Sequence, residues 1–178
     1  VEHIKDRSDY LRGNLVEDFL NPITAAVSED NVQLVKFHGF YQQDDRDVRL
    51  QRQEKKLEPA HSFMIRLRVP GGELSAEQWQ KMDAISDTYG NHTMRITTRQ
   101  ALQFHGIIKF EMKKTIQAMH AAALDSISGC GDVNRNVMCT PDPSLSPLSA
   151  EIFPYAEKIS EHLLPRSRAY HEIWLDEP

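Results

Sequence analysis

The sequence predicts an α+β fold in which an antiparallel sheet carries two helices on one face. Segment 62–70, SFMIRLRVP, alternates apolar and polar residues with the period of a strand. Segments 76–89 and 111–125 space their apolar residues as amphipathic helices do. Between them, segment 94–106 predicts two short strands, and a further strand is expected in 129–141. The resulting order, β-α-β-β-α-β, is the split-βαβ or ferredoxin-like pattern.

This pattern divides the chain into three parts. We expect an N-terminal extension over 1–60, one ferredoxin-like half-domain over 61–141, and a linker with the beginning of a further, incomplete domain over 142–178. Pro and Ser dominate the start of the last part, which also predicts a helix near 150–164 and a strand at 168–176. The chain has no initiator Met and stops just after this strand, so we expect it to be a fragment.

The N-terminal extension contains two predicted elements and a charged run. Residues 9–20 have helical apolar spacing, which Pro22 ends. Residues 32–41, VQLVKFHGFY, predict a strand that ends at Gly39. The run at 42–59 is nearly free of apolar residues, which predicts a solvated loop or an exposed helix.

Each element of the half-domain has one apolar face. In the first strand this face is formed by Phe63, Ile65, Leu67 and Val69. The first helix begins at a capping box of Ser75 and Gln78 and ends at Gly90. Its apolar stripe is Trp79, Met82, Ile85 and Tyr89, and the stripe of the second helix is Met112, Ile116, Met119 and Ala123. Met94 and Ile96 continue the buried face of the sheet.

The other face of the sheet is left without a helix and is rich in hydrogen-bond donors. It would hold Arg66, Arg68, Arg95, Thr97, Arg99, Gln103 and His105, and Arg135 would join it with its neighbours Asn134 and Asn136. One interpretation is a face that simply meets water. The other is a site for an anion, because clustered arginines repel one another and their planar forks suit carboxylates and oxyanions. Stacking of RNA bases would need exposed aromatic residues, and we place none on this face.

The bulk composition narrows the functional classes. The chain has 178 residues and a formal net charge of −5, which argues against non-specific nucleic-acid binding. No apolar run reaches the length of a membrane helix and no signal peptide is visible, so we expect a cytoplasmic protein. Cys130 and Cys139 lack CxxC spacing, which favours reduced thiols and no metal site in this chain.

Four motifs resemble the haemoprotein of NADPH-linked assimilatory sulfite reductases, a branch of the sirohaem nitrite/sulfite reductase family. They are YQQDDRD (41–47), IRLRVPGG (65–72), ITTRQALQFHG (96–106) and DVNRNVMCT (132–140). DYLRGN near the start and EHLLPRSRAYHEIWLD at 161–176 also look like that family. The resemblance covers essentially the whole chain but only about the first third of the family's length.

The resemblance implies six-electron reduction of sulfite to sulfide at sirohaem coupled to a [4Fe–4S] cluster. It implies that Arg66 and Arg135 contact sulfite. It assigns Arg99, Gln103 and His105 to the sirohaem carboxylates, with Arg68, Thr97, Asn134 and Asn136 as further cofactor-binding candidates. The expected partners are an NADPH-dependent flavoprotein, or a ferredoxin, and the remaining domains of the same chain.

The family's cluster cysteines and two substrate lysines have no counterpart here, and Cys139 is expected to be a packing residue. We therefore expect this fragment to lack the cluster, to bind sirohaem weakly or not at all, and not to turn over. Without the second half-domain, exposed apolar surface is expected to favour self-association. Two alternatives stay open: a fragment of a sirohaem nitrite reductase, and a non-catalytic ferredoxin-like module that binds a small anion or RNA.

Overall fold

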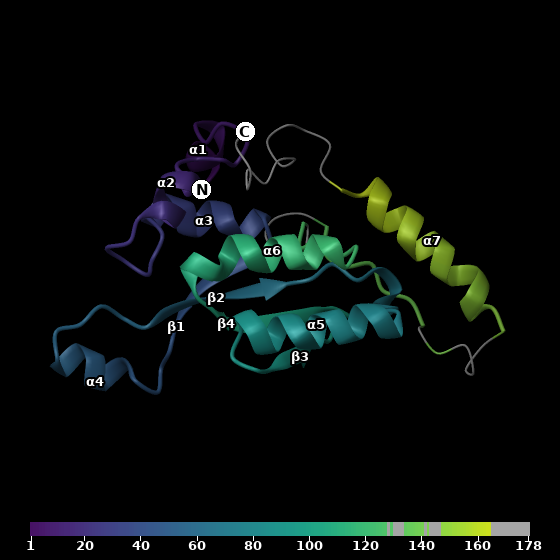
Figure 1. The fold of residues 1–178 in the computed structure, drawn as a ribbon. Coiled ribbons are helices and arrows are strands. Elements are labelled where there is room, and N and C mark those ends of the chain that lie inside the picture. Colours follow the sequence, from purple (N-terminus) through teal and green to yellow (C-terminus); the bar gives the residue numbers. More distant parts are fainter. Residues whose placement is uncertain (128, 130–133, 141, 143–146, 165–178) are drawn as a thin grey trace.

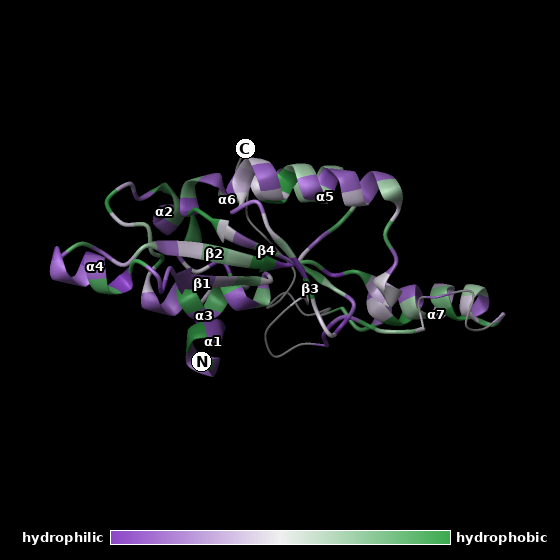
Figure 2. Ribbon diagram, turned by 90° about the horizontal axis from the view of Figure 1, so that it is seen from below, coloured by the Kyte–Doolittle hydropathy of each residue, from purple (hydrophilic) through white to green (hydrophobic). Residues whose placement is uncertain are grey.

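The structure is a computed structural model that describes residues 1–127, 129, 134–140, 142 and 147–164 (Figure 1). Its centre is a four-stranded antiparallel sheet in the order β1-β2-β4-β3. The strands are β1 (Phe40–Asp44), β2 (His61–Arg66), β3 (Met94–Ile96) and β4 (Leu102–Ile107). Helices α5 (Ala76–Tyr89) and α6 (Met112–Ala121) lie on the same side of this sheet (Figure 2). This arrangement confirms the predicted α+β, ferredoxin-like fold.

The helix-covered face of the sheet forms the core. Phe63, Ile65 and Leu67 have no exposed surface, as the alternation in β2 predicted. The Ser75 hydroxyl accepts a hydrogen bond from Gln78 N–H at 3.1 Å, and the Gln78 side chain accepts one from Ser75 N–H at 3.0 Å. This is the predicted capping box at the start of α5, and it supplies acceptors for two N–H groups near the helix start.

Three residues that were expected in the core are exposed. Trp79 is 43% exposed, so the buried stripe of α5 begins one turn later, at Met82. Ile96 is 75% exposed because it ends the short edge strand β3. Ala123 follows the end of α6 and has a φ of 56°, so it leaves the helical period, and Ala122 is buried in its place.

The predicted strand at 32–41 is wrong over most of its length. Residues 29–37 form helix α3 (Glu29–Phe37), and only the last part of the segment enters β1. Leu34 and Phe37 of this helix pack with Leu11, while Val35 joins the main core. Burial at positions spaced three and four apart is helical, and the short apolar run did not distinguish this from a strand.

The predicted helix at 9–20 is correct only in its second half. The structure has α1 (Glu2–Asp6), which the sequence did not predict, and α2 (Leu15–Leu20). Between them Asp9, Tyr10 and Leu11 all have positive φ, which no helix tolerates. The buried position of Leu11 offers a tertiary reason for this turn.

β1 lies at the edge of the sheet, beside β2. Further along that edge, Asp125 forms an isolated bridge to β2's continuation, where its carbonyl accepts from Arg68 N–H at 2.8 Å. The described residues of the expected strand, 129 and 134–140, form no strand. The rest of that segment lies outside the described residues.

The charged run at 42–59 was expected to be a solvated loop or an exposed helix, but its first three residues belong to β1. The rest contains an exposed helix, α4 (Arg49–Glu54), which projects from the sheet (Figure 1) and is largely hydrophilic (Figure 2). Helix α7 (Ser149–His162) confirms the helix predicted near 150–164. It contacts the turn η1 (Pro70–Gly72), where the Phe153 ring fills the space that a side chain at Gly71 would need. The strand predicted at 168–176 lies outside the described residues, and the three-part division of the chain stays a prediction.

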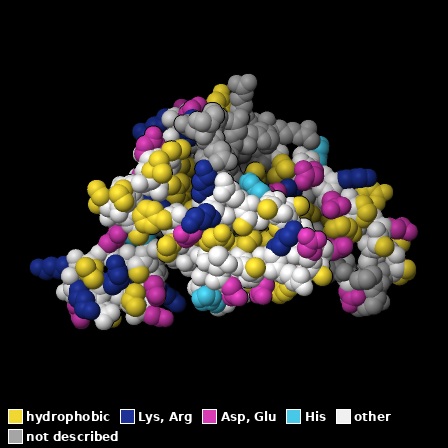
Figure 3. Space-filling view, viewed as in Figure 1, with side chains coloured by type: hydrophobic (Ala, Val, Ile, Leu, Met, Phe, Trp, Pro, Cys, Tyr) yellow, Lys and Arg dark blue, Asp and Glu magenta, His cyan; other side chains and the backbone are white. Residues whose placement is uncertain are grey.

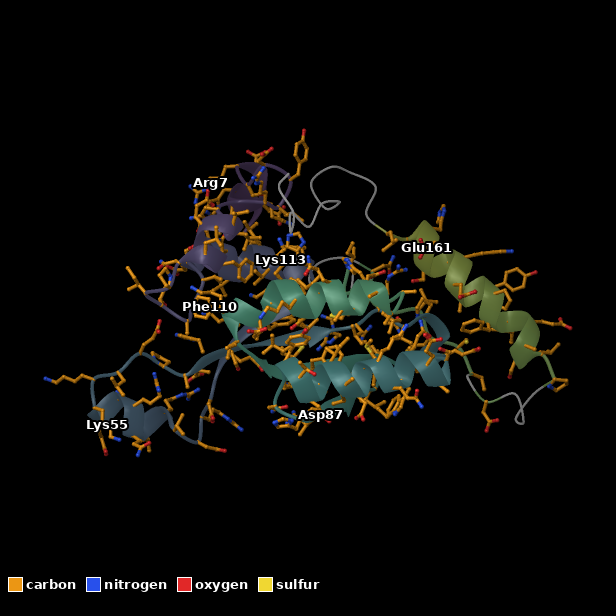
Figure 4. The ribbon with its side chains drawn as sticks, in the orientation of Figure 1. Arg7, Lys55, Asp87, Phe110, Lys113 and Glu161 are labelled. Carbon is orange, nitrogen blue, oxygen red and sulfur yellow. The ribbon has the colours of Figure 1, made fainter. Side chains whose placement is uncertain are left out.

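Hydrophobic side chains gather where the loop after α2 meets the start of α6 (Figure 3). Leu20 and Ile23 are 75% and 90% exposed, and Ile108 and Phe110, before and within η2 (Lys109–Glu111), are about half exposed (Figure 4 labels Phe110). Lys109 anchors the loop after α2, because its ammonium donates hydrogen bonds to the carbonyls of Asn21 and Ala26. Self-association through such surface stays a prediction. Within the described residues, no helix is long and apolar enough to cross a membrane.

Candidate anion-binding site

Three strands place one polar residue each in a single row across the face of the sheet opposite α5 and α6. This face is not fully open, since Met64 on it is buried. In the strand register, Arg66 of β2 lies opposite Gln103 of β4, and Gln103 lies opposite Arg95 of β3. His105 lies two residues further along β4, on the same face. We call these four residues the sheet cluster. Arg95 is exposed, whereas Arg66, Gln103 and His105 are half-buried. The side chains of these last three residues therefore contact protein groups as well as solvent.

Gln103 joins Arg66 to His105. In the amide orientation that satisfies both neighbours, its oxygen accepts from Arg66 Nη2 at 2.7 Å and from Nε at 2.9 Å. Its nitrogen then donates to His105 Nε2 at 3.3 Å. One glutamine therefore fixes one edge of the guanidinium and one nitrogen of the imidazole.

The surroundings of His105 favour its neutral form. Burial lowers its pKa from the ordinary value, and the positive charges of Arg95 and Arg66 lower it further. A neutral imidazole can accept a hydrogen bond at Nε2 when its proton sits on Nδ1. This agrees with the contact that Gln103 donates.

The guanidinium of Arg66 has no carboxylate partner within the described residues. Its guanidinium carbon lies 6.0 Å from the centre of the Tyr41 ring, and Nη1 donates to the Gly129 carbonyl at 3.4 Å. Tyr41 of β1 therefore lies on this face, which was expected to carry no aromatic residue. The sequence missed it because it did not predict β1 as a neighbour of β2.

The turn that joins β3 to β4 carries Arg99. The Thr97 hydroxyl accepts from the N–H groups of Arg99 and Ala101, both at 3.2 Å, and so shapes the turn. The Arg99 side chain is exposed. Thr97 and Arg99 were expected to continue the strand alternation of β3, but β3 ends at Ile96 and both lie in the turn.

Asn136 ties a distant segment to this turn. It is 8% exposed, and its side-chain oxygen accepts from Val69 N–H at 2.8 Å. Its nitrogen donates to the carbonyls of Val69 at 2.6 Å and Arg99 at 2.8 Å. These bonds place the backbone beside Arg135 next to the Arg99 turn, and the side chains of Asn134 and Arg135 are exposed.

Gln100 makes a second tie that the sequence did not predict. Its amide donates to the Cys139 carbonyl at 2.6 Å and accepts from Cys139 N–H at 3.1 Å. The Cys139 thiol lies against Gly71, with its sulfur 3.9 Å from the Gly71 carbonyl oxygen, as expected for a packing residue. Cys130 lies outside the described residues. A glutamine in a turn gives no sequence signal of a partner 39 residues away.

Arg68 does not join the sheet cluster. Its guanidinium binds both carboxylate oxygens of Asp125, with Nη2 at 2.7 Å and Nε at 3.1 Å. Nη1 also donates to Glu161 of α7 at 2.8 Å and to the Ser160 hydroxyl at 3.0 Å (Figure 4 labels Glu161). β2 ends at Arg66, but Leu67 and Val69 stay buried as the alternation predicted. Arg68 is set apart from the cluster by its two carboxylate partners, which occupy its guanidinium.

The remaining arginines suit an anion. Within the described residues, Arg66, Arg95, Arg99 and Arg135 form no ion pair with a carboxylate. Arg66 and Arg95 lie in one row with Gln103, which adds an amide to the donors. The part of the chain that the structure describes contains no cluster of three His, Cys, Asp or Glu residues that could hold a metal ion. The donor set therefore fits a small oxyanion or the carboxylates of a larger molecule.

Comparison with known proteins gives one matching family model and several relatives. Residues 55–122 match the nitrite/sulfite reductase ferredoxin-like half domain. Sulfite reductase [NADPH] haemoprotein β-components from Bacillus licheniformis and Bacillus subtilis are each 56% identical over 99% of this chain, and that from Staphylococcus carnosus is 55% identical. The chain spans about 31% of the length of these relatives.

A solved structure shares the fold. The structure of the Mycobacterium tuberculosis NirA protein matches with a TM-score of 0.62 over 77% of this chain and 26% of that chain. At 24% sequence identity, this match supports the architecture alone.

Proposed function

The chain carries the ferredoxin-like half domain of the nitrite/sulfite reductases and is homologous along its length to sulfite reductase haemoproteins, and on this premise we propose that it is part of a sulfite reductase. The complete protein would reduce sulfite to sulfide with six electrons. This chain would supply one wall of the site, where arginines bind the anionic substrate and the carboxylates of sirohaem. The names of the relatives favour sulfite over the nitrite alternative.

The observation that carries this proposal is the contrast between abundant guanidinium groups and missing carboxylates. Arg66 and Arg95 lie on one face of the sheet, Arg99 lies in the adjoining turn, and Asn136 ties the backbone beside Arg135 to that turn. Like charges repel one another, and no carboxylate of the described residues forms an ion pair with these arginines. A polycarboxylate such as sirohaem would supply the missing charges through bidentate, charge-assisted hydrogen bonds. The residues present therefore fit that group.

We assign the roles by what each side chain has left to offer. Arg66 and Arg135 would bind sulfite, and Arg99, Gln103, His105 and Asn134 would bind the sirohaem carboxylates. Arg68, Thr97 and Asn136 were candidates for cofactor contacts, but their polar atoms already bind protein groups. We propose that these three act by positioning the others.

The arginines would act in two ways during the reaction. They would draw the dianion to the site and offset its charge as the S–O bonds break. A guanidinium has a pKa above about 12 and is a poor proton donor, so a water molecule held by Arg66 or Arg135 is the proton donor that we propose. When bound, sirohaem and a [4Fe–4S] cluster would supply the iron and the electrons.

The rest of the complete protein would complete the site. The relatives are β-components, a name that denotes one part of an enzyme with several components. We propose an NADPH-dependent flavoprotein as the electron donor, with a ferredoxin as the other candidate, and a cytoplasmic location. The remaining domains would bring the cluster cysteines and the second half-domain.

Two substitutions in the complete protein test the assignment. Arg135→Ala should lower sulfite turnover while the visible spectrum still shows bound sirohaem. Arg99→Ala should instead lower sirohaem occupancy. Full activity in Arg135→Ala would refute the substrate assignment, and normal occupancy in Arg99→Ala would remove that residue from the cofactor site.

The non-catalytic alternative predicts a different result. An isolated anion- or RNA-binding module should bind RNA in a salt-dependent manner as the 178-residue chain. Tyr41 gives the sheet face one aromatic ring, but the Arg66 guanidinium lies over it. We therefore expect no such binding.

A further inference from the structure

Gln103 stands between two side chains with opposite requirements. A guanidinium has only donors and needs an acceptor, whereas a neutral imidazole offers an acceptor at one nitrogen. The amide meets both needs in one orientation, with its oxygen on Arg66 at 2.7 and 2.9 Å and its nitrogen 3.3 Å from His105 Nε2. Turning the amide by half a rotation would set its NH2 group against the guanidinium, so this orientation is strongly selected.

We propose that neutral His105 is a positioning residue, which holds Arg66 in place by fixing the direction of the Gln103 amide. This goes beyond the direct cofactor contacts that the proposed function gives to Gln103 and His105. Only its consequence for the substrate rests on the proposed function. The inference itself concerns three side chains of this chain.

Protonation of His105 would reverse the arrangement. In the imidazolium both ring nitrogens donate, so Nε2 could no longer accept from the Gln103 amide. The Gln103 oxygen would then be drawn to His105, and Arg66 would lose the acceptor that binds its Nε and Nη2 atoms. Arg66 would keep its charge but lose its fixed direction.

The surroundings of His105 oppose this protonation. The charged groups that act on it are Arg95 of β3 and Arg66 of β2, and both are positive. Tyr41 of β1 is the further titratable group on this face, and its ring lies near the Arg66 guanidinium. With burial, these charges lower the pKa of His105, so Arg66 stays fixed at neutral pH.

A fixed Arg66 has a defined capacity for an anion. Gln103 occupies the edge formed by Nε and Nη2, which leaves Nη1 with one long contact, at 3.4 Å, to the Gly129 carbonyl. Hydrogen bonds that are set before the substrate arrives cost no reorganisation during the reaction. We therefore expect loss of the His105 acceptor to weaken anion binding without removing any charge from the site.

Nitrogen-15 NMR of the 178-residue chain tests the coupling without any ligand. At neutral pH we expect His105 to carry its proton on Nδ1, and the Arg66 Nε–H signal, assigned by its loss in Arg66→Lys, to be protected from solvent exchange. As the pH falls, this protection should disappear in step with the protonation of His105. A protected Arg66 signal that persists through that titration, or no protection at neutral pH, would overturn the proposal.

Three variants separate positioning from packing. His105→Gln keeps an acceptor at every pH, so the Arg66 signal should stay protected in acid. Gln103→Glu offers a carboxylate to both neighbours and should raise the titration midpoint of His105 by about one pH unit or more. His120→Gln, at an exposed position of α6, should leave the titration as in the parent chain. A parent-like acid loss in His105→Gln would also overturn the proposal.

These outcomes are independent of sulfite reduction. If the complete protein fails to reduce sulfite, the proposed function falls while the NMR coupling stands. If the coupling is absent but Arg135→Ala still loses turnover, the positioning role falls and the proposed function stands.

Discussion

Arg66 and Arg68 lie two residues apart along the same stretch of chain and have opposite fates. Arg66 is bound by the Gln103 amide and has no carboxylate partner among the described residues. Arg68 is bound by two carboxylates and a hydroxyl, and its side chain is 11% exposed. We infer from this comparison that an arginine suits a ligand when protein groups hold its direction but leave its charge unpaired.

The largest effect is expected when the unpaired arginine is removed. In the complete protein, Arg66→Ala should lower sulfite turnover per bound sirohaem by about 100-fold or more, because a fixed charge that offsets the developing negative charge is lost. Steady-state kinetics with sirohaem quantified from the visible spectrum measures this. Turnover within about twofold of the parent enzyme would be a far smaller loss than the one expected for a group that stabilises a transition state. It would show that Arg66 contributes no more to turnover than a surface residue does.

Substitution of Asn136 tests whether its hydrogen bonds hold the segment that carries Arg135. Asn136→Ala removes three short hydrogen bonds and leaves buried polar groups of Val69 without partners, which should lower the free energy of unfolding by about 2 kcal/mol. Denaturant unfolding of the 178-residue chain measures this. The neighbouring Asn134→Ala is the matched control, since that side chain is exposed. Equal effects in the two variants would mean that Asn136 does not anchor the segment.

Arg68 should matter for stability rather than for chemistry. Arg68→Ala leaves the carboxylate of Asp125 without its arginine partner and removes one of the contacts that bind α7, so we expect a loss of about 1–2 kcal/mol in unfolding free energy. The control is Arg49→Ala, which breaks an equally short but exposed pair with Asp44. Screening by solvent should make that effect much smaller. Similar losses in the two variants would contradict the structural role of Arg68.

The smallest effect is a dependence of stability on pH. The unfolded chain protonates His105 near its ordinary pKa of about 6.5, whereas the folded chain does so at lower pH because burial and two arginines lower that pKa. The unfolded state therefore binds more protons in this window, and the free energy of unfolding falls as the pH drops below about 6.5. His38 shifts in the same direction because it is buried. The part of the pH dependence of unfolding free energy that disappears in His105→Gln is the contribution of His105. An unchanged pH dependence in this variant would refute that contribution.

Local signals in the sequence predicted the centre of the fold well. The capping box at Ser75 and the glycine after α5 are encoded within a few residues, and the structure confirms both. The alternation in β2 is correct for Phe63, Ile65 and Arg66, whereas Met64, which was expected on the polar face, is buried. Arg66, Arg95, Gln103 and His105 share that face because strand period alone determines it.

The parts that failed depend on distant contacts. Arg68 binds Asp125 and Glu161, which lie 57 and 93 residues away, and no local pattern announces such partners. The helix at 29–37 is set by packing against Leu11 and the core, which a short apolar run does not reveal. For the same reason the place of β1 beside β2, and with it Tyr41, could not be read from the sequence.

The central claim is that the direction and unpaired charge of Arg66, rather than the arginine content of this stretch, make an anion site. The most direct test compares Arg66→Lys with Arg68→Lys in the complete protein, with sulfite turnover measured per bound sirohaem. Both variants keep the charge, but a lysine cannot offer the Gln103 oxygen the same planar edge. The account predicts a large loss for Arg66→Lys and near-parent turnover for Arg68→Lys. Equal losses, or a greater loss for Arg68→Lys, would contradict it.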